Sequence, residues 1–134
     1  IALPEGHPLG ARSSLSPADL ADQTWIGTPE GLPFDRILRR IEGANGTPAR
    51  IAQRFADNGI VESLVAAGHG IAILPRYTTR DRENGLITRP LTGVRASRLI
   101  SVLMRPDRAE RPSVRAVVTA LRDEAARFEA QHTG

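Results

Sequence analysis

Residues 64–75 read LVAAGHGIAILP and place a Gly-x-Gly between two apolar runs, a pattern that often marks a phosphate-binding loop. In nucleotide-binding loops the glycines follow a strand and lead into a helix, because the phosphate must meet the free N–H groups of the helix N-terminus. Here Gly68 and Gly70 follow the helical run, so they face the carbonyl end of a helix, which disfavours anions. We therefore expect Gly68 to cap the helix in a left-handed conformation and Gly70 to allow close packing at the start of a buried strand.

The change between helix and strand recurs along the rest of the chain. Apolar or alternating runs predict strands at residues 1–3, 24–27, 50–56, 71–74, 86–91 and 99–105. Helical signals predict helices at residues 16–21, 34–43, 60–67 and 111–128, and a single turn at 75–80. Ser16 and Asp19 form a capping box at the start of the first helix, and Gly43 is expected to end the second. Such alternation predicts an α/β domain with a largely parallel sheet.

The composition predicts one folded domain and narrows its chemistry. With 134 residues and 40% apolar side chains, the chain is long enough for a single compact domain with its own core. No apolar run reaches about 18 residues, so no membrane span is expected. Cysteine is absent, which excludes thiolate ligands, and His7, His69 and His132 lack the spacing of a metal site. No cofactor and no bound metal are therefore expected, and the lack of cysteine and of a signal-peptide pattern predicts a cytoplasmic location.

The basic residues do not indicate a nucleic-acid surface. All 18 are arginine, they are spread from Arg12 to Arg127, and the net charge is only +3. A protein that reads nucleic acid concentrates its positive charge and adds aromatic side chains for stacking, whereas this chain has one Trp, one Tyr and three Phe. We expect a solvated surface of mixed charge.

The sequence contains no set of residues that converges on a catalytic nucleophile. It has no Gly-x-Ser-x-Gly elbow, and its serines lie in expected loops or, like Ser63, inside an expected helix. We therefore expect a protein that is not an enzyme. A small α/β hydrolase or transferase stays open as an alternative, as does a solute-binding receptor outside the cytoplasm.

Two expected helix N-termini that directly follow strands are better candidates for a ligand site. One is the loop TPEGLP at residues 28–33, and the other is the segment DNG at residues 57–59. In an open α/β sheet, ligands bind beyond the carboxyl ends of the strands, where helix N–H groups can hold a small carboxylate. Thr28 and Asn58 can add side-chain hydrogen bonds, although the sequence by itself favours ordinary turn and cap roles for both. The carboxylates at these two positions, Glu30 and Asp57, would repel an anion and would suit a donor group on the ligand.

Four segments together resemble the effector-binding domain of LysR-type transcriptional regulators. They are IALPEGHPLG, SPADLADQTWIG, ESLVAAGHGIAILP and RLISVLMRPDRAERPSVRAVVTALRDEA, which run in the order of the family and are distributed over nearly all of the chain. The resemblance implies a fold like that of type 2 periplasmic binding proteins, with two α/β lobes joined by crossover strands. On that template residues 1–134 are a partial effector-binding domain. Residues 9–91 form the second lobe, and residues 98–134 supply the returning crossover strand and the C-terminal helix of the first lobe.

The resemblance also implies a sensor of a small, carboxylate-bearing molecule that binds in the cleft between the lobes. The effector-facing residues that it implies on this lobe are Thr28, Pro29, Glu30, Gly31, Phe55, Asp57 and Asn58. The family's helix-turn-helix and most of its first lobe have no counterpart in this sequence, so any contact with DNA would be made by residues outside it. The expected partner is a second copy of the chain, in a dimer or tetramer. The last helix gives a reason, because its apolar stripe of Val114, Val117, Val118, Leu121, Ala125 and Phe128 needs a cover.

Overall fold

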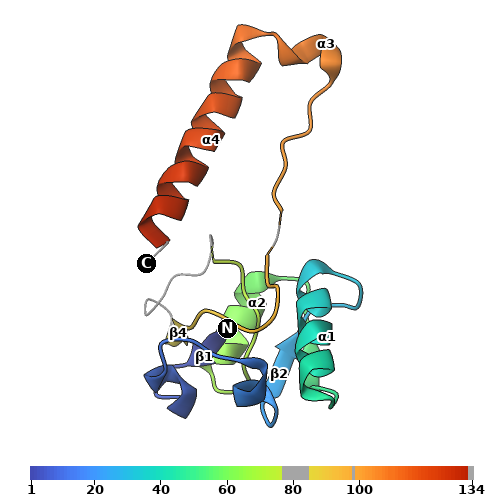
Figure 1. Ribbon diagram of the computed structural model, residues 1–134, viewed down its shortest axis with the longest axis vertical. Helices are drawn as coiled ribbons and strands as arrows, with labels where there is room; N and C mark the ends of the chain where they lie inside the picture. The colour runs from blue at the N-terminus through green and yellow to red at the C-terminus, as the bar shows by residue number, and fades with distance from the viewer. Residues whose placement is uncertain (77–84, 98, 133–134) are drawn as a thin grey trace. The chain divides into compact units, whose positions relative to one another are not determined.

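A computed structural model of the chain describes residues 1–76, 85–97 and 99–132, with side chains described through residue 130. The chain forms two compact units, Ile1–Arg98 and Leu99–Gly134. The first unit holds all of the described strands and the two helices that pack against them (Figure 1). The expected turn at residues 75–80 falls mostly outside the described residues.

The strands of the first unit form one continuous ladder through short pairings. Strand β2 (Thr24–Gly27) pairs in parallel with β3 (Arg50–Arg54), and β1 (Ala2–Pro4) pairs antiparallel with β4 (Leu86–Thr88). Residues 71–72 lie between these two pairs, because Ile71 forms a parallel bridge to Trp25 and Ala72 an antiparallel bridge to Ala2. The spatial order is therefore β3, β2, residues 71–72, β1 and β4.

The sheet is mixed, so the expectation of a largely parallel sheet is wrong for the half that contains β1 and β4. Apolar runs reveal that a strand is buried on both faces, but they are the same whichever way the strand runs. The strand expected at residues 71–74 is shorter in the structure, where pairing is confined to Ile71 and Ala72. The backbone N–H of Ile71 donates to the Thr24 carbonyl at 2.8 Å, which ties this central segment to β2.

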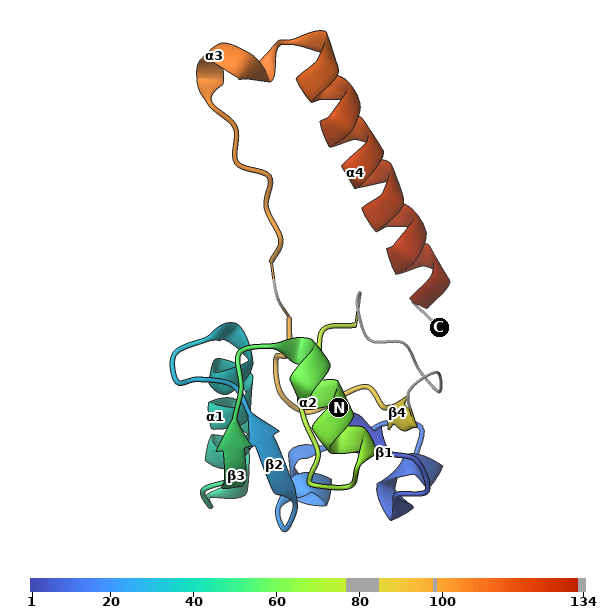
Figure 2. The same cartoon turned by 180° about the vertical axis from the view of Figure 1, so that it is seen from behind.

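Two apolar clusters cover opposite faces of the ladder. Helix α1 (Pro33–Asn45) packs on the face that holds Trp25, and helix α2 (Asn58–Ala66) on the face that holds Ile26 (Figure 2). Consecutive residues of β2 point to opposite faces because side chains alternate along a strand. The α1 cluster consists of Leu3, Leu15, Leu20, Trp25, Ile37, Leu38, Ile41 and Ile71. Its helical members, Ile37, Leu38 and Ile41, lie at the i, i+1 and i+4 spacing of one helix face.

The glycine expectations are confirmed at the opening stretch and wrong at α1. Gly68 has φ +79° directly after α2, which is the left-handed cap expected for it. A Cβ on Gly70 would lie 2.7 Å from the Thr24 carbonyl oxygen, so only glycine fits there. Gly43 lies inside α1, and the helix ends instead at Gly46, which has φ +69°. The left-handed position falls at Gly46, one turn past the last buried residue of the helix, Ile41.

The first expected helix is a short 3-10 helix, Pro17–Leu20, preceded by another at Pro8–Ala11. Its capping box is present, since Oδ2 of Asp19 accepts from the Ser16 N–H at 2.8 Å and from the Ser16 hydroxyl at 2.8 Å. These hydrogen bonds, the backbone one first, hold the pKa of Asp19 below its ordinary value, and the charge of Arg12 adds to the effect.

The second unit contains α3 (Pro106–Ala109) and α4 (Pro112–His132). The strand expected at residues 99–105 is absent, and this segment is extended and unpaired among the described residues. A strand needs a partner for its backbone groups, and Leu99 and Leu103 are 90% and 94% exposed here. On α4 the expected apolar stripe exists, but Val117 and Leu121 are both exposed. None of the described helices is long and apolar enough to cross a membrane.

Candidate functional site

The carboxyl ends of β2 and β3 lie side by side and bring the two candidate loops to one edge. Gly27 pairs with Arg54 at the ends of the strands, and the Phe55 N–H donates to the Gly27 carbonyl at 2.9 Å. Thr28 and Phe55 therefore leave the sheet next to each other. The structure thus places the two segments singled out in the sequence, residues 28–31 and 55–58, at the same edge.

Thr28 contributes a hydroxyl that the described residues leave unused. The residue is 8% exposed, and its Oγ1 has no hydrogen-bond partner among the described residues. It borders a pocket of about 10 Å³, whose other walls include the apolar side chains of Trp25, Phe34 and Ile73. A buried hydroxyl without a partner costs on the order of 1–3 kcal/mol, so its retention at this edge favours a role outside folding.

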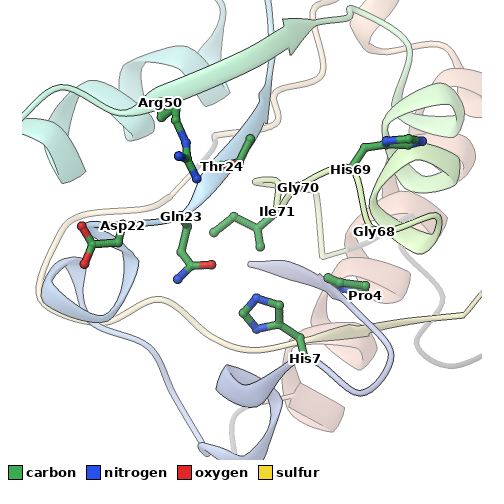
Figure 3. Close-up of a pocket in the computed structure, with 10 residues that line it drawn as sticks. All are labelled: Pro4, His7, Asp22, Gln23, Thr24, Arg50, Gly68, His69, Gly70 and Ile71. Carbon is green, nitrogen blue, oxygen red and sulfur yellow. The ribbon is translucent and has the colours of Figure 1, made fainter.

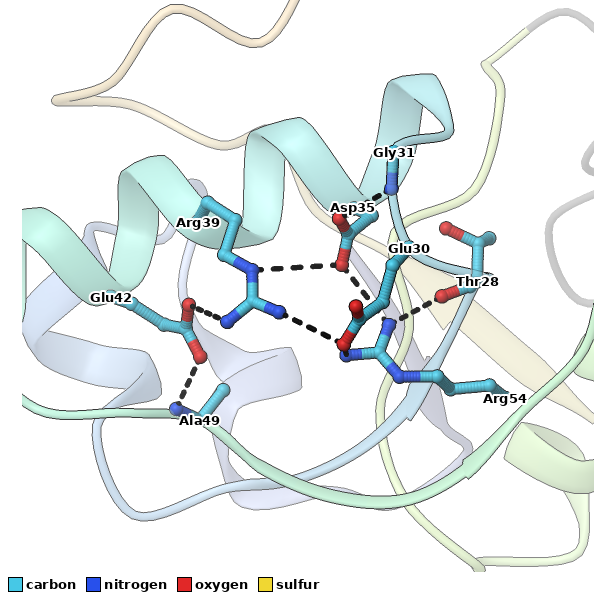
Figure 4. A network of polar contacts seen from close by, with 8 residues as sticks. All are labelled: Thr28, Glu30, Gly31, Asp35, Arg39, Glu42, Ala49 and Arg54. Carbon is cyan, nitrogen blue, oxygen red and sulfur yellow. Dashed lines mark hydrogen bonds and ion pairs between the residues drawn. The ribbon is translucent and has the colours of Figure 1, made fainter.

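The loop after β2 is held by a pair of opposite charges (Figure 4). Nη1 of Arg54 donates to the Thr28 carbonyl at 2.5 Å and to Oδ1 of Asp35 at 3.0 Å. Oδ2 of Asp35 accepts from the Gly31 N–H at 2.9 Å. Both carboxylate oxygens of Asp35 and one guanidinium nitrogen of Arg54 are therefore committed to the loop and to each other.

Asp35 stays ionised although it is buried. The residue is 5% exposed, and this burial alone would raise its pKa. The hydrogen bonds from Gly31 and Arg54, with the charges of Arg39 and Arg54, outweigh the burial and hold the pKa of Asp35 below its ordinary value. The carboxylate is a fixed negative charge in the first turn of α1.

The ion-pair cluster around Asp35 and Arg54 contains more carboxylates than guanidinium groups. Nη2 of Arg39 lies 3.4 Å from Oε1 of Glu30, and Nη1 of Arg39 lies 3.1 Å from Oε2 of Glu42. Glu42 comes first among the groups that raise the pKa of Arg39. Three carboxylates, those of Glu30, Asp35 and Glu42, thus surround two guanidinium groups. With its positive charge already neutralised, this cluster does not attract a further anion.

The two helix N-termini at this edge differ in what they offer a ligand. At α1, Pro33 has no N–H group, and the first turn already contains the buried carboxylate of Asp35. At α2, Asp57 is the N-cap, and its Oδ1 accepts from the Ile60 N–H at 3.0 Å. The N–H groups of Asn58 and Gly59 have no acceptor in the part of the chain that the structure describes. The N-terminus of α2 therefore presents two free donors within the described residues, and its dipole favours an anion there.

A larger hollow lies at the opposite end of the strands (Figure 3). It has a volume of about 220 Å³ and is lined by Pro4, His7, Asp22, Gln23, Thr24, Arg50, Gly68, His69, Gly70 and Ile71. The Leu9 N–H donates to Nδ1 of His7 at 3.2 Å. His69 turns its ring away from the other side chains. The charges of Arg50 and Asp22 oppose each other and the carbonyl end of α2 borders the hollow, so it selects neither an anion nor a cation.

One candidate nucleophile, Ser63, and the metal-ligating side chains can be placed in the described residues. The hydroxyl of Ser63 donates to the Gly59 carbonyl at 2.9 Å, within α2. No group of three or more metal-ligating side chains occurs within residues 1–76, 85–97 and 99–132.

The sequence matches a family model, described as LysR substrate binding domain, over residues 1–126. The chain belongs to this family. The expected LysR resemblance and the fold like that of type 2 periplasmic binding proteins are thereby confirmed. The curated regulator TtuA from Agrobacterium vitis, an HTH-type transcriptional regulator, is 37% identical over 98 residues, which are 70% of this chain. The chain spans 32% of the length of that relative.

Solved structures of LysR-family effector-binding domains share the fold. The effector-binding domain of QuiR in complex with shikimate is 18% identical, with a TM-score of 0.62, and the match covers 98% of this chain and 60% of that one. The effector-binding domain of BenM with its effector benzoate is 26% identical, with a TM-score of 0.58, over 71% of this chain and 45% of that one.

Sequence reasoning missed the two LysR-domain residues that hold the loop, Asp35 and Arg54. They are 19 residues apart, so no local spacing links them. The one available signal was the acidic residue three positions into a helix that begins with proline, which suggests a carboxylate turned back towards the loop. What that carboxylate would pair with could not be inferred before the register of β3 was known.

Proposed function

We propose that the chain is the ligand-sensing part of a LysR-type transcription regulator and that it binds a small, carboxylate-bearing effector. The proposed contacts on this lobe are Thr28, Pro29, Glu30, Gly31, Phe55, Asp57 and Asn58. The observation that carries the proposal is the Thr28 hydroxyl, which is buried without a partner in the part of the chain that the structure describes, at the edge where a sheet of this kind binds ligands.

The chemistry of α2 supports a carboxylate as the ligand's polar group. Two N–H groups, those of Asn58 and Gly59, are free of acceptors within the described residues and lie at the positive end of the helix dipole. The negative charge of Asp57 lies beside them, but its Oδ1 is engaged by the Ile60 N–H. BenM, which shares 26% identity with the chain, is bound to benzoate, a carboxylate.

The proposed mechanism is a shift between two arrangements of the lobes. The effector would bind between this lobe and the first, and it must have different affinities for the two arrangements, or it shifts nothing. The DNA contact would come from a helix-turn-helix outside these residues, in a cytoplasmic dimer or tetramer. These residues by themselves are not expected to shift operator DNA at physiological salt, and a sequence-specific shift would contradict the proposal.

Backbone-amide NMR with benzoate tests the effector site directly. In a titration of the chain with benzoate, we expect the amide signals of Thr28, Gly31, Asn58 and Gly59 to move at about millimolar concentrations, since this lobe forms only one wall of a cleft. Benzamide has the same ring and shape without the charge, and it should move the Asn58 and Gly59 signals much less. Signals that move only around His7 and Arg50, or that move equally with both compounds, would count against the proposal.

A further inference from the structure

One pair of side chains fixes the loop at residues 28–31 at both of its ends. Arg54, from the end of β3, holds the Thr28 carbonyl, and Asp35, from the first turn of α1, holds the Gly31 N–H. The hydrogen bond of 3.0 Å between Arg54 and Asp35 joins the two attachments (Figure 4). The loop is thereby tied to a strand and to a helix at once, and the position of the Thr28 hydroxyl depends on this pair.

The other charged residues nearby contact the pair without holding the loop backbone. Nε of Arg39 lies 3.8 Å from Oδ1 of Asp35, and Nη2 of Arg39 lies 3.4 Å from the exposed carboxylate of Glu30. Nη2 of Arg54 lies 3.7 Å from that same carboxylate. Arg39 therefore provides a matched control, because it carries the same charge as Arg54 and touches the same acids.

Asp35 has a second consequence for a ligand. Its carboxylate is fixed in the first turn of α1, where an incoming anion would otherwise meet the positive end of the helix dipole. The N-terminus of α2 has no such internal carboxylate beyond its cap. An anionic ligand would accordingly place its charge at α2 and its uncharged part against the loop.

We propose that Asp35 and Arg54 are positioning residues for the effector: they hold the loop that presents the Thr28 hydroxyl, and they direct the anionic end of the ligand to α2. The inference rests on the proposed function for its ligand part. Its loop part concerns the chain alone and can be tested without any ligand.

Amide hydrogen exchange in Asp35→Asn tests the loop part. We expect the Gly31 N–H to exchange about tenfold faster than in the wild type, because the neutral amide is a weaker acceptor and no longer attracts Arg54. The Ile71 N–H, bonded to Thr24 at the far end of the sheet, should keep its rate. The wild type offers a second test that does not depend on whether a variant folds. In a pH titration followed by NMR, the chemical shifts of the Gly31 amide proton and the Asp35 carboxyl carbon should change with the same midpoint.

Benzoate affinity tests the ligand part, because the expected change in affinity is opposite in direction to the change that net charge alone predicts. Asp35→Asn removes a negative charge and Arg39→Gln a positive one, so simple electrostatics predicts tighter binding in the first and weaker binding in the second. We expect the reverse order: about fivefold weaker benzoate binding in Asp35→Asn, and a change within about twofold in Arg39→Gln.

Tighter binding in Asp35→Asn, or a Gly31 exchange rate that stays at the wild-type value, would overturn the inference. So would a loosened loop with unchanged benzoate affinity, which would make the pair structural only. If benzoate does not move the amide signals of Thr28 and Asn58 in the wild type, the proposed function is overturned, and the ligand part of the inference with it. The Gly31 measurement would still decide the loop part, so the two failures are distinguishable.

Discussion

The amino and carboxyl ends of the parallel strands β2 and β3 carry similar residue types, but these residues make different contacts at the two ends. At the amino end, Arg50, Asp22 and His7 surround a hollow of about 220 Å³ in which opposite charges leave no preferred ligand. At the carboxyl end the pocket is far smaller, yet Arg54 and Asp35 are bonded to the backbone and hold a loop in place. Side chains that hold a loop backbone, and a buried hydroxyl without a partner among the described residues, therefore indicate a binding edge better than the size of a hollow does.

At the amino end, enlarging a side chain should reduce the stability of the fold more than at the carboxyl end. Gly70→Ala would place a Cβ 2.7 Å from the Thr24 carbonyl oxygen, in the backbone of β2. We expect the free energy of unfolding to fall by about 3 kcal/mol, because neither backbone can move without disturbing the central segment. Urea denaturation measures the change.

Gly68→Ala is the control for this substitution, since a Cβ on Gly68 would meet nothing within 4 Å and only the left-handed φ of +79° is strained. It should cost about 1 kcal/mol. Equal losses in the two variants would show that close packing at Gly70 is not what makes this end rigid.

At the carboxyl end, the largest effect is expected from Asp35→Asn. The substitution removes the nearer carboxylate, 3.0 Å from the guanidinium of Arg54, and leaves the exposed carboxylate of Glu30 at 3.7 Å, which should lower the free energy of unfolding by about 2 kcal/mol at pH 7. Arg39→Gln, at an exposed position of the same cluster, should cost less than about 0.5 kcal/mol. Similar losses in both variants would contradict the distinct role given to the inner pair.

The pH dependence of this difference follows from the lowered pKa of Asp35. A carboxyl whose pKa is lower in the folded state contributes stability above its unfolded pKa and loses it as the pH falls through the folded value. The gap between wild type and Asp35→Asn should be constant from neutral pH down to about pH 5 and should shrink below the ordinary value of 3.8. Asp19, whose pKa is also lowered, is present in both proteins and cancels. A gap that widens in acid would refute the assignment.

A smaller effect is expected at the N-cap of α2. Asp57→Asn keeps a capping oxygen for the Ile60 N–H and removes the charge beside the free N–H groups of Asn58 and Gly59. Stability should change by less than about 0.5 kcal/mol, while benzoate binding should tighten about threefold. Isothermal calorimetry or the NMR titration measures the affinity. Weaker binding would place the anion elsewhere.

Much of the fold could be predicted because its signals are local. The apolar face at Ile37, Leu38 and Ile41, the cap at Asp57 and the turn at Gly68 each depend on a few neighbouring residues. The direction of β1 and the unpaired segment at residues 99–105 were mispredicted because strand pairing depends on residues distant in the chain.

The placement of the two candidate loops at one edge was predicted, but the side-chain contacts made there were not. The rule that ligands bind beyond the carboxyl ends of strands brought residues 28–31 and 57–58 together correctly. It could not show that Asp35 fills one helix N-terminus, since a carboxylate in a first turn has the same sequence pattern whether it is exposed or buried. Nor could it show that the Thr28 hydroxyl lacks a partner, which depends on every neighbouring atom.

The most direct test of the account is the Thr28→Val variant, measured for stability and for benzoate binding together. Valine matches the shape of threonine and removes only the unpartnered hydroxyl. If that hydroxyl is kept for a ligand, the free energy of unfolding should rise by about 0.5 kcal/mol while benzoate affinity falls about fivefold. A variant that is less stable than the wild type and binds benzoate equally well would contradict the central claim.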